Sequence, residues 1–401
     1  MKESFIRGTR QARSAIEHRA TQLKIALRYT RTMWYLLRKR GLRALYNFLW
    51  SKAFVREVGP ALLDPIWRKW PWTAPYPKFV EIEVTTKCHL RCIICEHTHW
   101  KEKPRDLTFD EFKKIIDQFP GLKWCNPTGE GSAFLNKDYI RMLRYLKSKD
   151  VFVEFVESFD QIDENLAREI IKIGIDRIWV SFDGATKDTY EKIKVGCSFE
   201  KTLKNLRNFI RIKKEMKSPI PELCFRFVIT TLNYKEMPQF IELVASLGDW
   251  KALGDGSYVE FAGLLSFKEI EHLNQPFVPK EIIEETAKKA KELGVHWAFC
   301  HSGKLPDVSL CAAWTEPYIM MPGYVLPCCA VLMANKREFL RKYSFGNMLE
   351  QPFREIWNSK RYRTFRKLVP QTKGKVPILC SGCRAYDTSK REKKYGITPK
   401  I

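Results

Sequence analysis

The chain has 401 residues, of which 45% are hydrophobic, so it is long enough for a core larger than that of one small domain. It carries 70 Lys and Arg against 46 Asp and Glu, a net charge of +24 that predicts contact with nucleic acid, anionic lipid headgroups or an acidic substrate. No run of about 18 apolar residues is present, which excludes a membrane-spanning helix. The N-terminus lacks an apolar signal segment, so we expect a reducing cytoplasm, where metal binding explains clustered cysteines better than disulfides do.

Residues 1–77 are predicted to form a basic helical extension that ends in a linker. Residues 1–50 hold 12 Lys or Arg against 2 Asp or Glu. Five prolines between residues 60 and 77 break any helix there and indicate the linker. An apolar stripe at helical spacing is flanked by basic residues: Trp34, Leu37, Leu45, Phe48 and Leu49, with Arg38, Lys39, Arg40 and Arg43. Such a helix suits a membrane interface, so we expect peripheral binding to an anionic membrane surface.

From residue 78 to about 266, strand-like and helix-like segments alternate. The helices are amphipathic, and the one that begins near Thr108 has a capping-box pattern with Glu111. Alternation of this kind predicts an α/β fold with a parallel sheet and helices on its outer face. Catalytic groups should then lie at the C-terminal ends of the strands. The predicted strands are 78–85, 121–126, 151–156, 176–182, 223–231 and 257–265, and a further helix is predicted over 280–295.

Three cysteines follow the first strand directly, as Cys88, Cys92 and Cys95 in the spacing C-x3-C-x2-C. Three thiolates can bind three irons of a 4Fe–4S cubane and leave the fourth iron open for a ligand. The alternative is a zinc site completed by His97 or His99.

This spacing after a strand resembles the signature of the radical S-adenosylmethionine (SAM) superfamily. The resemblance implies a partial (β/α)6 TIM-like barrel whose open iron binds the amino and carboxylate groups of SAM. The reduced cluster then cleaves SAM to a 5′-deoxyadenosyl radical, which abstracts hydrogen from an unactivated C–H bond. It also implies a cellular electron donor of the flavodoxin or ferredoxin type. The chain departs from the family in having Ile94, where an aromatic residue is common.

Further loops match the family's SAM-binding segments in position. After the second strand, a Gly-rich turn stands where the family has Gly-Glu-Pro, and either Glu130 or Ser132 would accept from the SAM amino group. The fourth-strand segment is similar to the family's Ser-x-Asp-Gly, which faces the ribose; a turn with Asp183 as a helix cap is the alternative. The resemblance implies these SAM-binding candidates: Gly129, Glu130, Gly131, Ser132, Ser181, Asp183 and Asn233.

The segment that follows the third strand departs from the family pattern and has Glu157 at its start. We expect Glu157 near the barrel mouth as a catalytic residue, in contact with substrate or as a proton acceptor. A solvated carboxylate at the rim is the alternative.

A second set of cysteines lies near the C-terminus: a single cysteine, a pair after a predicted hairpin, and a C-x2-C. Four thiolates suit either zinc or a fully ligated 4Fe–4S cluster. The run resembles the SPASM/twitch extension of radical SAM enzymes, which implies one auxiliary cluster and two 4Fe–4S clusters in all. The expected ligands are Cys311, Cys328, Cys380 and Cys383, with Cys329 as the alternative to Cys328. The remaining cysteines, Cys125, Cys197, Cys224 and Cys300, are expected to be ordinary buried residues.

The expected organisation is an extension over 1–77, a radical SAM barrel over 78–299, an auxiliary-cluster domain over 300–388 and a basic tail over 389–401. The basic aromatic extension favours a membrane lipid hydrocarbon chain as the substrate. The reaction expected for such a substrate is C–C bond formation in archaeal-type lipids. A SPASM-type enzyme that modifies peptides or proteins is the alternative. An extension that folds back as a lid on the barrel is less favoured, and a role with RNA is least favoured.

Overall fold

A computed structural model describes residues 29–51, 70, 73–74, 76–248, 250–265, 267–300, 315–334, 336–369 and 377–380. Two predicted auxiliary ligands, Cys311 and Cys383, lie outside these residues, as do most of the predicted linker and the tail 389–401. Within the described parts of the chain, no helix is long and apolar enough to cross a membrane.

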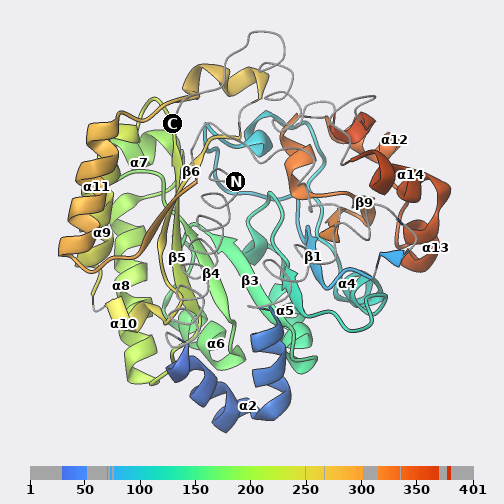
Figure 1. Cartoon of the computed structure of the whole chain (residues 1–401), viewed down its shortest axis with the longest axis horizontal. Coiled ribbons are helices and arrows are strands. Elements are labelled where there is room, and N and C mark those ends of the chain that lie inside the picture. Colours follow the sequence, from blue (N-terminus) through green and yellow to red (C-terminus); the bar gives the residue numbers. More distant parts are fainter. Residues whose placement is uncertain are drawn as a thin grey trace, which may run out of the picture.

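One curved sheet of nine strands forms the centre of the molecule, in the order β7-β6-β5-β4-β3-β2-β1-β8-β9 (Figure 1). Its first six strands are parallel and follow chain order, and each overlaps its predicted range. The predicted α/β partial barrel is therefore confirmed. These six strands are β1 (Phe79–Ile82), β2 (Trp124–Asn126), β3 (Phe152–Glu157), β4 (Arg177–Ser181), β5 (Glu222–Ile229) and β6 (Val259–Gly263).

Three further strands extend the sheet beyond the six predicted units. At one edge, β7 (Trp297–Cys300) pairs in parallel with β6 and was not predicted. At the other edge, β8 (Tyr318–Met320) pairs in parallel with β1 and antiparallel with β9 (Tyr324–Leu326). The β8–β9 pair is the hairpin expected before Cys328. The C-terminal region is thus joined to the barrel through the same sheet.

Helices cover the outer face of the sheet, as the strand–helix alternation predicts (Figure 1). The capping box is present, because Thr108 Oγ1 accepts from the Glu111 N–H and Glu111 accepts from the Thr108 N–H. These helices are α4 (Phe109–Ile116), α5 (Tyr139–Ser148), α6 (Glu164–Ile173), α7 (Lys187–Ile193), α8 (Phe199–Glu215), α9 (Met237–Ser246), α10 (Trp250–Leu253) and α11 (Lys280–Glu292). Short 3-10 helices lie at η3 (Glu96–His99), η4 (Ala133–Leu135), η5 (Tyr234–Glu236) and η6 (Lys268–Leu273).

The small C-terminal region packs around aromatic rings beside the hairpin. Phe345 and Tyr362 stack with ring centroids 3.8 Å apart, and the Arg366 guanidinium lies 4.2 Å from the centroid of Trp357. Its helices are α12 (Arg337–Tyr343), α13 (Phe353–Asn358) and α14 (Lys360–Leu368), with 3-10 helices at η9 (Cys329–Ala334) and η10 (Ile378–Cys380).

Helix α2 (Thr30–Trp50) divides the predicted apolar stripe between a buried face and an exposed face. The buried side chains include Leu36, Ala44 and Phe48, whereas Trp34 and Leu37, both in the predicted stripe, are exposed. A kink at Gly41, whose φ of 83° interrupts the helix, shifts the phase of its second half, so the stripe does not follow one continuous face. Of the predicted stripe, only Phe48 is fully buried.

The buried face of α2 packs against the N-terminal ends of the first three strands. Phe48 lies in one apolar cluster with Phe79, Trp124 and Phe152, which begin β1, β2 and β3. Figure 1 accordingly shows α2 at the end of the barrel where these strands begin. The helix therefore lies at the opposite end of the sheet from the loops that follow the strands.

Candidate functional site

The three predicted cluster cysteines lie together in the loop after β1, at the C-terminal edge of the sheet. The thiols of Cys88, Cys92 and Cys95 are close enough to interact electrostatically. Burial raises the pKa of Cys92 and of Cys95, and the ammonium group of Lys194 acts in the opposite direction at Cys92. Among the described residues, no group of three or more His, Cys, Asp or Glu side chains is arranged closely enough to hold a single metal ion.

The Gly-rich turn after β2 packs directly against the start of the cysteine loop. A Cβ on Gly131 would lie 2.4 Å from the carbonyl oxygen of Thr85, and one on Gly129 would lie 2.9 Å from the Cα of Glu83. The Ser132 N–H donates to the carbonyl of Lys87 at 2.8 Å. Gly129 also has a φ of +81°, which favours glycine. Both glycines therefore allow two loops of the site to meet.

Glu130 presents a buried carboxylate at this junction. Neither of its oxygens forms a hydrogen bond within the described residues, and its nearest ion-pair partner is Arg337 Nη1, 3.5 Å from Oε2. Burial, reinforced by the nearby carboxylates of Glu96 and Glu83, raises its pKa well above the usual range. A buried carboxylate without hydrogen-bond donors is suited to an ammonium group, so the residues present here fit the amino group of SAM.

Ser132 faces a different set of partners. Its Oγ lies 3.2 Å from Cys88 Sγ and 2.9 Å from His89 Nδ1, and His89 Nε2 lies 2.6 Å from Asp160 Oδ2. Burial alone would raise the pKa of Asp160, but hydrogen bonds from His89 and Ser158 bring it below its usual value. The sequence analysis did not identify His89 or Asp160, which are 71 positions apart.

The same polar chain continues to Glu157 at the end of β3. The Ser158 hydroxyl lies 2.5 Å from Asp160 Oδ1 and 3.0 Å from Glu157 Oε1. Glu157 is only 6% exposed, and burial raises the pKa of its carboxyl group. The residue thus lies at the mouth as expected, and the alternative of a solvated rim carboxylate is wrong.

The candidates on β4 and β5 form one buried polar group. Asp183 Oδ1 accepts from the Val228 N–H at 2.8 Å, and Lys194 Nζ lies 3.1 Å from Asp183 Oδ2 and 2.8 Å from Ser181 Oγ. The Asn233 amide donates to the carbonyls of Asp183 and Val228. Asp183 does not cap the next helix, because Thr186 does so. Lys194, which also lies near Cys92, was not identified from the sequence.

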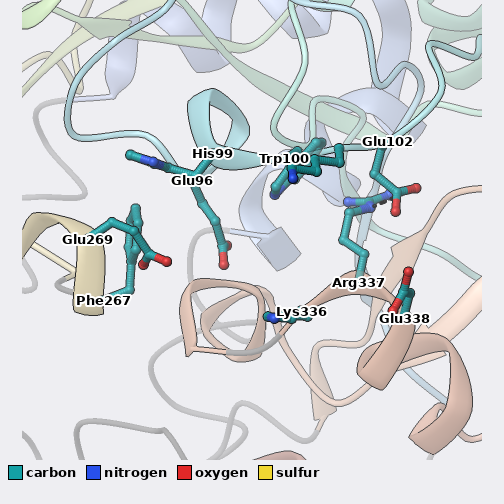
Figure 2. A pocket seen from close by; sticks show the side chains of 10 residues that line it. Glu96, His99, Trp100, Glu102, Phe267, Glu269, Lys336, Arg337 and Glu338 are labelled. Carbon is teal, nitrogen blue, oxygen red and sulfur yellow. Dashed lines mark ion pairs between the residues drawn. The ribbon is translucent and has the colours of Figure 1, made fainter.

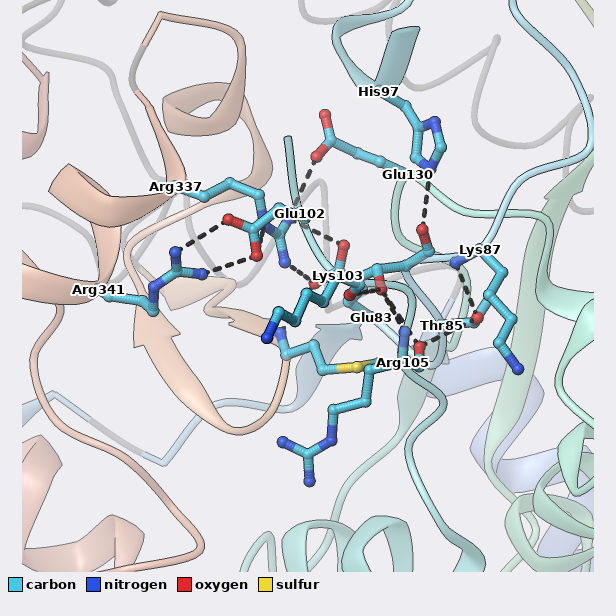
Figure 3. Close-up of polar contacts among 12 residues, drawn as sticks. Glu83, Thr85, Lys87, His97, Glu102, Lys103, Arg105, Glu130, Arg337 and Arg341 are labelled. Atoms are coloured by element: carbon cyan, nitrogen blue, oxygen red, sulfur yellow. Dashed lines mark hydrogen bonds and ion pairs between the residues drawn. The ribbon is translucent and has the colours of Figure 1, made fainter. Parts of the chain in front are cut away.

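Arg337 is the centre of an ionic network between the C-terminal region and the cysteine loop (Figure 3). Its guanidinium donates to both oxygens of Glu83, at 2.5 and 3.0 Å, and Glu83 also accepts from the Met321 N–H at 2.9 Å. Arg341 donates to both oxygens of Glu102 at 2.9 Å. Arg337 was not identified from the sequence, because no motif marks it.

A cavity of about 390 Å³ opens between η3, η6 and the start of α12. Figure 2 shows the Glu96 side chain, next to Cys95 in the chain, pointing into this space. Eight of its ten lining residues are ionisable, among them Glu96, Glu102, Glu269, Glu338, Lys336 and Arg337. The Arg337 guanidinium lies 4.2 Å from the ring centroid of Trp100. The cavity is therefore strongly polar and lies between the two cysteine regions.

The described auxiliary cysteines lie in different surroundings. Cys380 is buried, and Cys328 packs against the main apolar core of the molecule and interacts electrostatically with Tyr362. The Cys329 thiol instead interacts with Glu81 on β1.

A partial α/β barrel with three cysteines at its mouth and a small cysteine-bearing region beside them defines an iron–sulfur enzyme of the radical SAM class. The family model for the radical SAM superfamily matches residues 82–244, and that for the SPASM iron–sulfur cluster-binding domain matches residues 311–384. The chain belongs to the radical SAM superfamily and carries a C-terminal SPASM domain. Its cofactors are therefore SAM, a 4Fe–4S cluster and auxiliary iron–sulfur.

Known proteins resemble most of the chain. The tungsten-containing aldehyde ferredoxin oxidoreductase cofactor-modifying protein of Pyrococcus furiosus is 23% identical over 77% of this chain and 88% of its own length. Mycofactocin maturase of Mycobacterium tuberculosis is 23% identical over 79% of this chain and 81% of its own. Among solved structures, Streptococcus suis SuiB bound to SAM has a TM-score of 0.59 and 13% identity, covering 88% of this chain and 86% of SuiB. The structure of SuiB bound to the precursor peptide SuiA has a TM-score of 0.56 and 13% identity, covering 82% of this chain and 73% of that one.

Proposed function

We propose that this radical SAM enzyme modifies a peptide or protein side chain that enters the cavity beside Glu96. The observation that carries the proposal is the charged lining of that cavity, because a hydrocarbon chain would leave its ionic groups poorly solvated and unpaired. A polar peptide segment can supply hydrogen bonds and charges to the same walls. The likeness in fold to SuiB, which has been solved with a precursor peptide, supports the same class of substrate.

The position of α2 also weighs against the lipid substrate that the sequence favoured. That expectation rested on the basic aromatic helix, which packs against the first residues of β1, β2 and β3. The cysteine loop follows the other end of β1. A strand of six residues such as β3 spans about 20 Å, so the helix and the mouth are separated by at least that order of distance. Binding of α2 to a membrane, which we retain as a proposal, would leave the mouth at the far end of the barrel.

Each residue of the site has a proposed role. We assign the SAM-binding cluster to Cys88, Cys92 and Cys95, and the SAM ammonium group to Glu130. When bound, the cluster and SAM supply the 5′-deoxyadenosyl radical. Ser181 is the ribose candidate, beside Asp183 and Asn233, which join the loop after β4 to the end of β5. Glu157 contacts the substrate or accepts a proton; unchanged product formation by Glu157→Gln would remove it from this role.

The auxiliary cluster is assigned to Cys311, Cys328, Cys380 and Cys383. Cys328 is preferred to Cys329 because it fits the Gly-x4-Cys spacing of the resembled extension, counted from Gly323. Two 4Fe–4S clusters require about eight irons per chain. Iron and zinc analysis of the reconstituted protein tests this, since four irons with one zinc would exclude an auxiliary cluster. A flavodoxin or ferredoxin is the proposed electron donor.

The substrate class is tested by comparing cells that express the wild-type enzyme with cells that express Cys88→Ala. Cys125→Ala, at a buried cysteine outside the proposed ligands, is the matched control. We expect mass spectrometry to find a modified peptide or protein in wild-type and control cells only. A change confined to the lipid extract would refute the proposal.

A further inference from the structure

A second cavity, distant from the cysteines, is lined almost entirely by basic and aromatic side chains. It has a volume of about 450 Å³ and lies between α2, the end of α8 and α10. Seven of its twelve lining residues are Lys or Arg, and none is Asp or Glu. Six of the cations, Arg31, Arg38, Lys39, Lys214, Lys217 and Lys251, lie at the exposed rim.

Several basic side chains near this cavity already have structural partners. Asp255 lies 2.9 Å from Arg31 and accepts from the Thr32 N–H, so this pair anchors the start of α2. Lys213 is buried and donates to the carbonyls of Leu253 and Pro221. These contacts explain why Arg31 and Lys213 are present, but they do not explain the accumulation of Arg38, Lys39, Lys214 and Lys217 around the same space.

Such a concentration of positive charge favours an anion. Like charges around one cavity repel one another, and a bound anion removes that repulsion. Burial, with the charge of Arg31 added, lowers the pKa of Lys213 to about 7. The Arg38 guanidinium lies 4.0 Å from the ring centroid of Trp34, a contact that fixes one wall of the cavity. Phosphate is the common anion that several Lys and Arg side chains hold together.

The helix that lines the cavity, α2, also exposes several large apolar side chains. Leu42 is 75% exposed, Trp34 and Tyr46 are each 55% exposed, and Leu37 and Leu49 are also exposed. Aromatic and aliphatic side chains beside basic ones are the pattern of helices that lie in a membrane interface. Binding of a soluble phosphate compound would not explain why Leu42 and Tyr46 are exposed.

We propose that the α2 face is a membrane-docking surface whose basic cavity receives the phosphate of an anionic phospholipid headgroup. Trp34, Leu42 and Tyr46 enter the interfacial layer while Arg38, Lys39, Lys214 and Lys217 contact headgroups. The enzyme is thereby held with its barrel mouth away from the bilayer, open to a substrate that arrives from the aqueous side. This binding does not depend on the identity of that substrate, so it can fail or succeed independently of the proposed function.

The test uses the full-length reconstituted enzyme and vesicles of phosphatidylcholine with or without phosphatidylglycerol. The cavity variant is Arg38→Gln, Lys39→Gln and Lys214→Gln. The matched control, Lys204→Gln, Lys288→Gln and Lys291→Gln, removes the same charge from exposed positions on α8 and α11. We expect wild type to co-sediment only with the anionic vesicles. The cavity variant should bind about 100-fold more weakly, against a few-fold for the control. A Leu42→Ala, Tyr46→Ala variant should weaken vesicle binding about tenfold.

Three results would overturn the proposal. Equal vesicle binding by the cavity variant and its control would show that the net charge of the protein, and not the cavity, determines membrane binding. Binding of pyrophosphate without binding of vesicles would assign the cavity to a soluble ligand. Binding of single-stranded RNA that the cavity variant loses, again without vesicle binding, would assign it to nucleic acid. Cleavage of SAM to 5′-deoxyadenosine in all variants serves as the folding control, because the cavity lies at the other end of the barrel.

Discussion

Glu130 and Ser132 lie two residues apart in one turn, yet their side chains meet different partners. The Glu130 carboxylate is buried without a hydrogen bond within the described residues and lies near Arg337, whereas Ser132 lies between Cys88 and His89. From the sequence alone, either residue could be the acceptor for the SAM amino group, because both are polar and close in the chain. Their separate surroundings make the choice testable.

Glu130→Gln is expected to weaken SAM binding by about 10- to 100-fold. A hydrogen bond to a charged group contributes about 1.5–3 kcal/mol, and the variant keeps the shape of the side chain but not its charge. Anaerobic calorimetry with the reconstituted enzyme measures the affinity. Glu157→Gln, at a buried carboxylate on the neighbouring strand β3, should leave SAM affinity within about twofold. Similar losses in the two variants would show that Glu130 has no special role.

Ser132→Ala is expected to make the reduction potential of the SAM-binding cluster more negative. A hydrogen bond to a cysteine sulfur stabilises the reduced, more negative cluster, and the loss of about 1 kcal/mol corresponds to roughly 40 mV in a one-electron couple. His89 and Asp160 hold the hydroxyl in place, so His89→Ala should shift the potential in the same direction. A redox titration monitored by electron paramagnetic resonance measures the shift. Ser132→Thr, which keeps the hydroxyl, should restore the wild-type potential, and an unchanged potential in Ser132→Ala would exclude the role.

The cysteines could be predicted because ligand spacing is local in the sequence. The side chains around them could not, because His89, Asp160, Lys194 and Arg337 come from four different segments. Only the fold brings these segments together, and a single charged residue carries no periodic signal. The same reason explains why Glu157 could be placed at the mouth, from its position at a strand end, while its burial could not.

At the scale of elements, Phe48 is the fully buried aromatic residue through which α2 packs against the barrel. Phe48 is buried beside Tyr29 and Phe152, with ring centroids 5.5 and 6.1 Å away. Phe48→Ala should lower the free energy of unfolding by about 3–5 kcal/mol, as removal of a buried Phe usually does. Urea denaturation followed by circular dichroism measures this. Leu42→Ala on the exposed side should change it by less than about 0.5 kcal/mol, and equal effects would mean that α2 does not pack as described.

Strand–helix alternation and caps were sufficient to predict the six units of the barrel. Each strand is bounded by turn residues, and each helix carries its own apolar stripe, so these signals are local. The burial of Phe48 within the stripe of α2 could not be predicted, because one residue, Gly41, changes the backbone direction inside a sequence that otherwise appears continuous. β7, which follows the helix predicted over 280–295, was not predicted.

For the whole molecule, Arg337 is the buried ionic connection between the SPASM region and the barrel. Arg337→Ala would leave Glu83 and Glu130 buried without their cation, a change that typically costs about 3–5 kcal/mol. We expect a lower thermal midpoint and faster proteolysis of the C-terminal region in the reconstituted enzyme. Arg341→Ala, whose pair with Glu102 is partly exposed, should have an effect of at most about 1 kcal/mol. Equal effects of the two variants would contradict this role for Arg337.

The pairing of β8 with β1 has a mechanical consequence. The strand that leads into the Cys88 loop is hydrogen-bonded to the hairpin that leads into Cys328, with Glu81 beside Tyr318 and Ile82 beside Ile319. The spacing between the Cys88 loop and Cys328 is therefore set by a β-ladder and not by the length of chain that separates them in the sequence. The hydrogen bonds of this ladder thereby hold the two proposed iron–sulfur sites at a fixed separation across one sheet.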